Sequence, residues 1–303
     1  MLESELGGLL ATLGLSPRQR GAVARRLGWD GGRPATLAEA GEVGGYTRER
    51  VRQLEERVAE RVSRTRPRLP LTASAVEILG TVTPAPRADA ARLLAERGLS
   101  SDPFDPAGVL HAARLAGIDV DVVAQRRGIF RRDDIVLNPV VATLARNLAT
   151  RDGAATPTAV ANLAGLRTKR VRRLLELGDA VSWLGDTGWF TLEPLSGAVA
   201  AMLRKLLAAT PDATARDLRN ALPTTLPLEV VDALLALVPR DGALSHTERA
   251  MVDALRGEGG EASARRLTRC AEQAGVTRAT AAVCLSRSPL FRHVERGRWA
   301  LAL

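Results

Sequence analysis

The clearest alternation of hydrophobic and polar positions lies in residues 36–58, TLAEAGEVGGYTRERVRQLEERV. Thr36, followed three residues later by Glu39, forms a capping box, which opens a helix by satisfying its free N–H groups. This helix is predicted to end at the Gly44–Gly45 pair, because glycine tolerates the left-handed conformation of a tight turn. Thr47 is then placed to cap a second helix. The pattern predicts two helices joined by a short turn.

The second helix has an apolar side and a polar side. Val51, Leu54 and Val58 recur at helical spacing and are expected to face the core. The side chains that fan out on the opposite side are those of Arg48, Glu49, Arg52 and Gln53. Such a pair of helices is typical of a helix-turn-helix whose second helix enters the major groove of DNA.

The residue types on the polar side suit base recognition. Arginine pairs with guanine, glutamine with adenine and glutamate with the amino group of cytosine, each good pair contributing ~1–3 kcal/mol. The alternative is a helical hairpin whose polar side is merely solvated. Under the first interpretation the candidate DNA-binding residues of this helix are Thr47, Arg48, Glu49, Arg52, Gln53 and Arg57.

The stretch resembles the fourth conserved region of bacterial RNA polymerase sigma factors of the housekeeping type. The shared pattern is T-L-x-E-x-G-x-x-x-x-x-T-R-E-R-[VI]-R-Q-x-E, and LSPRQRGAVARRLG (residues 15–28) resembles the helix that precedes it. The resemblance covers about residues 15–66. It implies that the second helix reads an upstream promoter element, with Arg48, Glu49, Arg52 and Gln53 as readers. Because only 14 residues precede Leu15 and aromatic residues are 3% of the chain, we expect the reading head alone and not a complete sigma factor.

Composition supports several small helical modules and a polyanionic partner. At 303 residues the chain is long enough for two or more domains. Hydrophobic residues make up 46% of it, but aromatic ones are scarce, which favours helical modules over large sheets. The net charge of +9 and an isoelectric point near 10.9 suit nucleic acid.

Residues 139–193 read as a winged helix. Helices are expected over residues 140–150, 156–163 and 167–177, followed by strands at 180–184 and 189–192 around the turn Gly185–Gly188. The third helix is crowded with basic residues. They either contact DNA or form a solvated face, and as candidates for DNA contact they are Arg167, Lys169, Arg170, Arg172 and Arg173.

Residues 244–303 repeat this plan. The expected helices are 247–255, capped by Thr247, then 264–274 and 277–285, and the strands are 291–295 and 298–303 about Arg296-Gly297. The phrase SPLFRHVERGRWALAL resembles the wing of bacterial winged-helix modules. Arg278 and Arg287 are its candidate DNA contacts.

Two further stretches fit the plan less well. Residues 72–138 are predicted to form helices at 74–82, 87–97 and 106–116, and strands at 119–123 and 135–137. Asp133 and Asp134 would then lie in a wing, and the third helix is expected to serve packing or partner binding. Residues 194–243 predict three helices with little room for a wing, the third being 228–237. Divergent modules at a period of 45–65 residues indicate a string of related units.

No catalytic or metal-binding pattern is present. Three histidines are scattered without a nucleophile at a telling spacing, and there is no phosphate-binding glycine loop between a strand and a helix. Cys270 and Cys284 could be drawn with His293 as a metal site, but buried thiols are the preferred interpretation. We therefore expect neither an enzyme nor a cofactor. With no signal peptide and no membrane-spanning run, we expect a cytoplasmic bacterial protein without a membrane partner.

The sequence thus predicts a mainly α protein of tandem helix-turn-helix and winged-helix modules with small β-hairpin wings. The modules are residues 1–66, 72–138, 139–193, 194–243 (degenerate) and 244–303. The predicted function is that of a sequence-specific, double-stranded DNA-binding transcriptional regulator. The alternative is an interaction or scaffold protein that docks on RNA polymerase or another protein.

Overall fold

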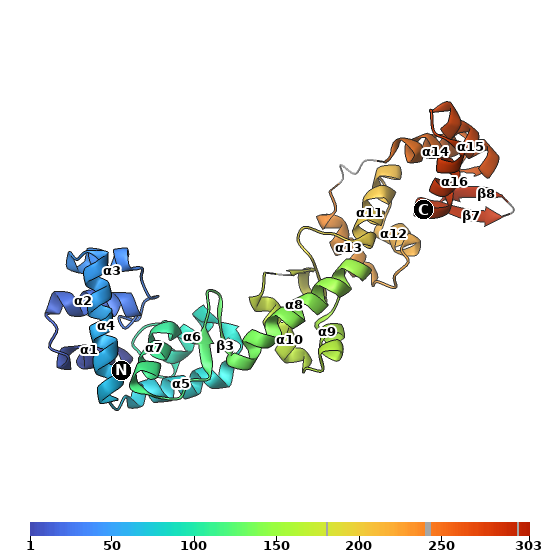
Figure 1. Ribbon diagram of the computed structural model, residues 1–303. Helices are drawn as coiled ribbons and strands as arrows, with labels where there is room; N and C mark the ends of the chain where they lie inside the picture. The colour runs from blue at the N-terminus through green and yellow to red at the C-terminus, as the bar shows by residue number, and fades with distance from the viewer. Residues whose placement is uncertain (180, 240–243, 296) are drawn as a thin grey trace. The chain divides into compact units, whose positions relative to one another are not determined.

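The computed structural model describes residues 1–179, 181–239, 244–295 and 297–303. These residues form sixteen α-helices and three small antiparallel sheets (Figure 1), so the expected mainly α fold is confirmed. The chain divides into two compact units. The first comprises residues 1–140 with 172–178, and the second comprises residues 141–171 with 179–303. The finer division into five modules remains a prediction.

The first unit opens with four helices, which are α1 (Leu2–Thr12), α2 (Pro17–Leu27), α3 (Leu37–Gly44) and α4 (Arg48–Thr65). Helix α2 begins with a capping box, in which Ser16 and Gln19 each accept a hydrogen bond from the other's backbone N–H. Helix α1 was not predicted, because the resemblance began at Leu15. Its leucines Leu2, Leu6 and Leu10 are buried in the core of the unit.

Residues 70–131 of the first unit follow the order helix, strand, helix, helix and hairpin, which is the order of a winged helix. Its elements are α5 (Pro70–Val82), β1 (Ala85–Pro86), α6 (Arg87–Glu96), α7 (Pro106–Ala116), β2 (Val122–Ala124) and β3 (Gly128–Arg131). The strands lie in the order β1-β3-β2, all antiparallel, with Ala85 opposite Ile129 and Val123 opposite Phe130.

One predicted strand of this module is wrong. Residues 135–137 belong to α8 (Arg132–Asp152), and the second wing strand is the shorter segment β3. Asp133 and Asp134 do not lie in a wing. They lie in the first turn of α8, where the helix dipole favours carboxylates. One Asp134 carboxylate oxygen accepts a hydrogen bond from the backbone N–H of Arg131 at 3.1 Å.

A single hydrophobic core joins α1, α2 and α4 to this module. It runs from Leu2 to Ile129, and seven of the eleven residues of α7 are buried. The backbone of α7 approaches the C-terminus of α2 so closely that a Cβ atom at Gly108 would lie 2.1 Å from the carbonyl oxygen of Gly28. Helix α7 therefore packs inside the protein, as its shortage of basic residues suggested.

The winged helix predicted at 139–193 contains the C-terminal half of α8, α9 (Pro157–Ala164), α10 (Thr168–Leu177), β4 (Ser182–Trp183), a 3-10 turn (Gly185–Thr187) and β5 (Phe190–Thr191). Strands β4 and β5 pair antiparallel, and Ala155 forms an isolated bridge to Phe190. This bridge occupies the place of the first strand of a winged helix. Ala180, where the first predicted strand begins, lies outside the described residues.

The remaining elements are α11 (Ala198–Ala209), α12 (Ala215–Ala221), α13 (Leu228–Leu237), α14 (His246–Gly257), β6 (Glu261–Ser263), α15 (Ala264–Gln273), α16 (Arg278–Arg287), β7 (Phe291–Glu295) and β8 (Arg298–Leu301). The last sheet has the order β6-β8-β7. Helix α14 is capped by Ser245 and not by Thr247, because the Ser245 hydroxyl accepts from the Glu248 N–H. Arg296, in the predicted turn, lies outside the described residues.

A buried carboxylate holds α11 and α14 together in the second unit. Glu248, whose side chain is 4% exposed, lies 2.6 Å from Nζ of Lys205 and accepts from the hydroxyls of Ser245 and Ser288 at 2.8 Å each. Burial alone raises the pKa of Glu248, but the hydrogen bonds from Lys205, Ser245 and Ser288 outweigh it and lower the pKa to about 2.

Two observations bear on the chemistry that the sequence left open. Cys270 and Cys284 are free, half-buried thiols, and among the described residues no three His, Cys, Asp or Glu side chains are grouped to hold a metal ion. No helix in the described part of the chain is long and apolar enough to cross a membrane.

Candidate nucleic-acid interface

Local hydrogen bonds and a left-handed glycine define the start of α3 and the turn between α3 and α4. The hydroxyl of Thr36 accepts from the Glu39 N–H at 3.3 Å, and the Glu39 carboxylate accepts from the Thr36 N–H at 2.7 Å, which confirms the predicted capping box. Gly45 ends α3 in the left-handed conformation with φ of 71°. The Thr47 hydroxyl then caps α4 by accepting from the Arg50 N–H at 3.2 Å.

Helix α4 is amphipathic in the predicted register. Val51, Leu54 and Val58 are fully buried, and α2 packs against both α3 and α4. An ion pair of 2.9 Å between Arg26 on α2 and Glu55 on α4 adds a polar clamp to this packing. All six predicted DNA-binding residues of this segment are exposed, namely Thr47, Arg48, Glu49, Arg52, Gln53 and Arg57.

The exposed face of α4 is internally paired. Arg52 donates through Nε and Nη2 to the two carboxylate oxygens of Glu49 at 2.9 and 2.8 Å, and its Nη1 also pairs with Glu56. The hydrogen bond from Arg52 lowers the pKa of Glu49, and pairing with Glu49 raises the pKa of the Arg52 guanidinium. Exposed pairs of this kind are weak. A base edge or a phosphate can therefore replace either partner at small cost.

The other members of the face differ in how free they are. Gln53 donates to Glu49 at 3.2 Å and accepts from Arg50 at 3.3 Å. Among the described residues, neither the Arg48 nor the Arg57 side chain has a hydrogen-bond or ion-pair partner. These two guanidinium groups are available to an anion without breaking any contact.

Helix α10 carries the second predicted basic cluster. Arg167, which precedes α10, and Lys169 are exposed, whereas Arg170 and Arg173 are half-buried. Arg172 is exposed and pairs with Glu176 at 2.8 Å. Within the first unit, Arg173 donates to the Val82 carbonyl oxygen at 3.5 Å. The cluster thus offers Arg167 and Lys169 most openly.

Helix α16 carries the third predicted set. The Thr277 hydroxyl caps it by accepting from the Thr280 N–H at 3.2 Å. Arg278 at its start and Arg287 at its end are both exposed. In the described part of the chain neither side chain has a hydrogen-bond or ion-pair partner.

All three pairs of helices use the same turn. Gly45, Gly165 and Gly275 are left-handed, with φ of 71°, 65° and 83°. The residue after each glycine donates its N–H to the carbonyl oxygen five residues before it, at 2.8, 3.0 and 3.0 Å. The residue six positions after each glycine is buried. A common register can therefore be counted from the glycine.

The sequence interpretation missed two exposed arginines of the C-terminal helix pair. Arg265 and Arg269 on α15 are exposed, and the described residues provide no partner for either side chain. They lie one turn apart on the first helix of the C-terminal helix pair. Their spacing of four residues was the available sequence signal, but no family pattern pointed to it.

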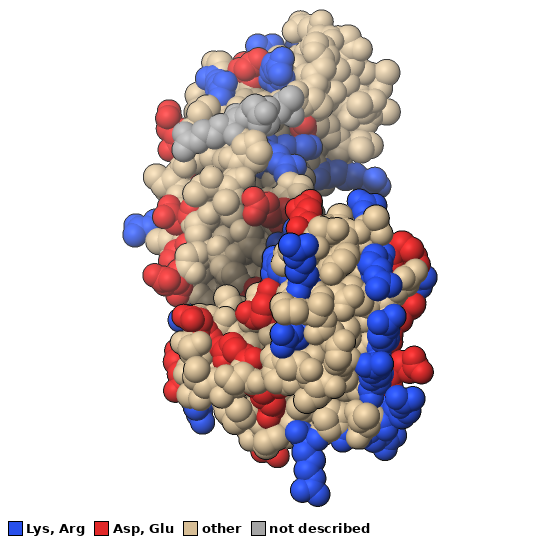
Figure 2. Space-filling view, turned by 90° about the vertical axis from the view of Figure 1, so that its left-hand side faces the viewer, with Lys and Arg blue, Asp and Glu red and all other residues tan. Residues whose placement is uncertain are grey.

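The surface distribution of charge is uneven. Figure 2 turns the left-hand side of Figure 1 toward the viewer, and in the lower part of this view basic side chains gather along the right-hand margin. Acidic side chains are more frequent away from this margin. An uneven distribution of this kind attracts and orients a polyanion.

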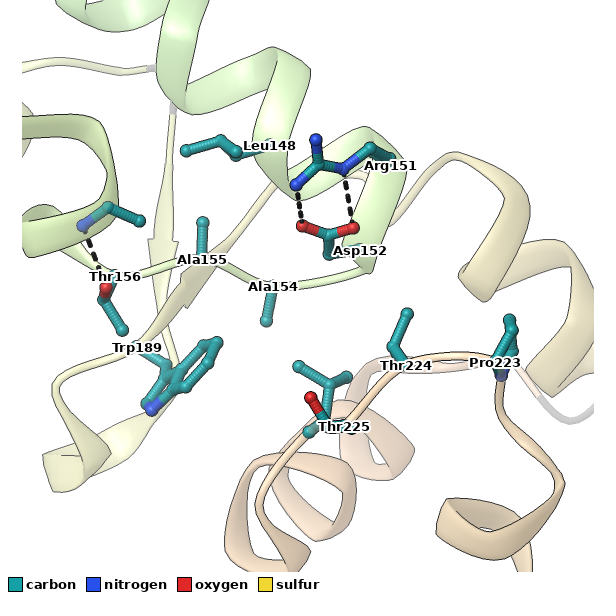
Figure 3. A pocket seen from close by; sticks show the side chains of 12 residues that line it. Leu148, Arg151, Asp152, Ala154, Ala155, Thr156, Trp189, Pro223, Thr224 and Thr225 are labelled. Carbon is teal, nitrogen blue, oxygen red and sulfur yellow. Dashed lines mark hydrogen bonds and ion pairs between the residues drawn. The ribbon is translucent and has the colours of Figure 1, made fainter. Parts of the chain in front are cut away.

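A pocket of about 370 Å³ lies in the second unit, between residues 148–159 and residues 223–226 (Figure 3). Trp189 and Thr225 line it, and its rim holds the bidentate ion pair of Arg151 with Asp152 at 2.8 and 2.7 Å. The buried hydroxyl of Thr224 has no hydrogen-bond partner among the described residues. The pocket has no basic side chain free of a carboxylate, so it is not part of the candidate DNA surface.

Comparison with known proteins finds sequence similarity for the segment that contains α2–α4. Residues 13–64 match the family model of sigma-70, region 4. The chain is 42% identical over 62 residues to RNA polymerase sigma factor SigA1 of Synechococcus elongatus, which is 20% of this chain and 15% of that factor. It is 48% identical over 48 residues to the chloroplastic RNA polymerase sigma factor sigF of Arabidopsis thaliana, 16% of this chain and 9% of that factor.

The matched segment is a small part of each relative, and no solved structure matches the chain. The predicted resemblance to region 4 is confirmed for this segment only. In sigma factors region 4 is a DNA-binding helix-turn-helix. The similarity therefore supports a role connected with DNA and transcription.

Proposed function

We propose that this protein is a sequence-specific, double-stranded DNA-binding transcriptional regulator that reads the major groove with α4. The observation that carries the proposal is the exposed Arg/Glu/Gln face on a capped helix-turn-helix whose segment matches sigma-70, region 4. In this proposal the protein is bacterial and cytoplasmic, and it acts without catalysis.

The residues of α4 have separate roles in this proposal. Arg52, Gln53 and Glu49 read base edges, because their groups match the donors and acceptors of guanine, adenine and cytosine. Arg48 and Arg57 contact phosphates, because their guanidinium groups have no partner among the described residues. Thr47, which is exposed at the start of the helix, assists them in this proposal.

The winged-helix modules support binding in the same proposal. Phosphate contacts there come from the basic residues of α10 and α16, which are Arg167, Lys169, Arg170, Arg172, Arg173, Arg278 and Arg287. Residues 1–66, 72–138, 139–193, 194–243 and 244–303 are the proposed modules. Phosphate contacts make binding depend steeply on salt, with about one unit of slope in log K for each phosphate neutralised.

A second candidate is favoured by the names of the relatives, which are RNA polymerase sigma factors. In this alternative the α3–α4 surface docks on RNA polymerase or another protein, and the tandem modules serve as a scaffold. The two candidates differ in whether single changes on α4 alter a preferred DNA sequence.

The experiment is a selection from a randomised duplex library with the full chain and with Arg52→Ala and Gln53→Ala. The expected result is a changed consensus and roughly tenfold or weaker binding to the original site, with a much smaller loss on random duplex. Arg64→Ala, an exposed arginine near the end of α4, is the charge-matched control. It should weaken both duplexes equally.

Two outcomes would contradict the proposal. Undetectable duplex binding even at low salt would exclude DNA as the partner. An unchanged consensus in both α4 variants, with normal melting curves, would favour protein docking by this surface.

A further inference from the structure

Helix α16 has charge only at its two ends. Its sequence is RATAAVCLSR, and Ala279, Ala282 and Val283 lie exposed between Arg278 and Arg287. Val283 is the most exposed large hydrophobic side chain of the helix, at 51%. Only Ala281 and Leu285 of the helix are buried. The helix therefore presents a small apolar strip framed by two arginines.

Counting from the left-handed glycine shows what this strip replaces. Arg48 and Arg57 are three and twelve residues after Gly45, and Arg278 and Arg287 are three and twelve residues after Gly275. The arginine frame is thus the same in α4 and α16. Between the arginines the helices differ, since Ala279, Ala282 and Val283 hold the places that Glu49, Arg52 and Gln53 hold on α4.

The frame has the dimensions of a DNA groove. Arg287 is nine positions after Arg278 in α16, a rise of about 13.5 Å along the helix. The major groove of B-DNA is about 12 Å wide. Both guanidinium groups can therefore reach phosphates while the middle of the helix faces the bases.

Charge favours duplex DNA over a protein as the occupant of this face. Residues 244–303 contain ten arginines and six acidic residues, an excess of four positive charges. Two of these ten arginines, Arg265 and Arg269 on α15, have no partner among the described residues. The three strands β6, β8 and β7 give the module the complete sheet of a winged helix.

The apolar strip restricts what α16 can recognise. Alanine and valine have neither a donor nor an acceptor for the polar base edges, and the C5 methyl of thymine is the apolar group that the major groove displays. We propose that α16 binds the major groove and selects thymine through methyl contacts of Ala279, Ala282 and Val283. This rests on the proposed function, because it requires that the protein bind duplex DNA.

Helix α16 therefore differs from α4 in the kind of base contact that it makes. Helix α4 recognises bases through polar groups, whereas α16 recognises them by apolar burial. Burying one methyl group against an aliphatic side chain contributes about 0.8 kcal/mol, which corresponds to roughly a fourfold change in affinity.

The test replaces thymine by deoxyuridine, which removes only the methyl group. The full chain is first footprinted on its selected duplex, and the subsite of α16 is the part whose protection is lost in the double variant Arg278→Ala, Arg287→Ala. Affinity is then measured on duplexes with thymine or deoxyuridine in this subsite alone. The expected result is about fourfold weaker binding per contacted methyl group.

Side-chain variants make the assignment specific. Val283→Ser should bring the ratio of thymine to deoxyuridine affinity toward one, with little change on the deoxyuridine duplex. The matched control is Val136→Ser, because Val136 on α8 is 73% exposed and lies outside the module. It should keep the wild-type ratio. Hydrogen exchange of α16 in each variant checks that the helix remains folded.

Each remaining outcome is decisive. An affinity ratio of one in wild type, with α16 protection intact, would overturn methyl recognition and leave the proposed function in place. Protection by α4 without any protection assigned to α16 would also overturn it and would favour a protein partner for the strip. Loss of all duplex binding would overturn both proposals.

Discussion

The module at α5–β3 and the module at α14–β8 have the same topology, but the third helix is mostly buried in the first and mostly exposed in the second. Both run helix, strand, helix, helix and hairpin, and their sheets have the equivalent orders β1-β3-β2 and β6-β8-β7. Their third helices are α7 and α16. Helix α7 buries seven of its eleven residues, and α16 buries two of ten.

The difference originates in the residues that face outward. The sequence of α7, PAGVLHAARLA, places apolar side chains on more than one face, so the helix can be covered on a second side by α4. Gly108 permits the approach to Gly28. On α16 the outward positions are small, and arginines stand at both ends. Two modules with the same order of elements can therefore differ in whether the third helix is buried or exposed.

The largest expected effect comes from Gly108→Val, which disturbs the packing of the buried helix α7 against the end of α2. Its Cβ would lie 2.1 Å from the backbone carbonyl oxygen of Gly28, and backbone atoms in a packed core cannot move aside cheaply. We expect a loss of about 3 kcal/mol or more in the stability of the first unit. Hydrogen exchange of the peptides from α2 and α7 measures it.

The matched control is Gly257→Ala at the end of α14, where an added Cβ meets no atom within 4 Å. This variant should be neutral or slightly stabilising, because alanine reduces the freedom of the unfolded chain. Unchanged exchange of α7 in Gly108→Val would mean that α7 does not depend on its close approach to α2.

A smaller effect is expected from Glu248→Gln, which tests how the module α14–β8 is anchored to α11. The pKa of Glu248 is lowered to about 2 from an ordinary 4.5. The carboxylate therefore contributes stability that is complete above pH about 4.5 and is lost as the pH falls toward 2, at most about 3 kcal/mol. Urea unfolding of the second unit between pH 7 and 3 measures this.

The Glu248→Gln variant should be less stable than wild type at pH 7. Its stability should also fall less than that of wild type between pH 7 and 3, because it lacks the titrating carboxylate. Glu295→Gln on the exposed strand β7 is the control and should retain the wild-type profile. Parallel pH profiles for wild type and Glu248→Gln would show that the carboxylate is not the titrating group.

The smallest expected effect concerns His111, which lies on α7 near Trp29, with ring centroids 6.3 Å apart. Burial lowers the pKa of His111, Glu55 opposes this, and Arg114 and Arg26 add to it. A histidine held neutral in the fold makes its full contribution above its unfolded pKa. The first unit should therefore lose stability as the pH falls below about 6.5.

The measurement compares denaturant unfolding of wild type and His111→Gln from pH 7.5 to 5.5, followed by hydrogen exchange of α7. The variant should show a flatter profile over this range. His246→Gln, on α14, should leave the wild-type dependence in place. An equal dependence in wild type and His111→Gln would assign the effect to another group.

Elements set by local chemistry were predicted well from the sequence. The capping box at Thr36, the left-handed Gly45 and the cap at Thr47 each depend on residues within four positions of one another. Helices 106–116 and 228–237 were predicted with the observed bounds for the same reason. The wing strand at residues 128–131 was missed, because four residues give too short a pattern to outweigh a neighbouring helix.

The sequence predicted which side chains of the candidate site are exposed, but not how these side chains pair with one another. Sequence periodicity placed Arg52 and Gln53 on the exposed side of α4. It could not show that Arg52 is held by Glu49 and Glu56, because side-chain pairing depends on rotamers as well as on spacing. Which of these residues contacts DNA remains a prediction.

The sequence by itself determined the local structure of this protein, namely the caps, the left-handed glycines and the amphipathic register of α4, because these depend on neighbouring residues. The tertiary structure alone decided that α7 is covered by the helices before it while α16 keeps its outer face open. The physical reason is that burial depends on residues distant in sequence. No local pattern in α7 specifies that the carbonyl oxygen of Gly28 will lie against Gly108.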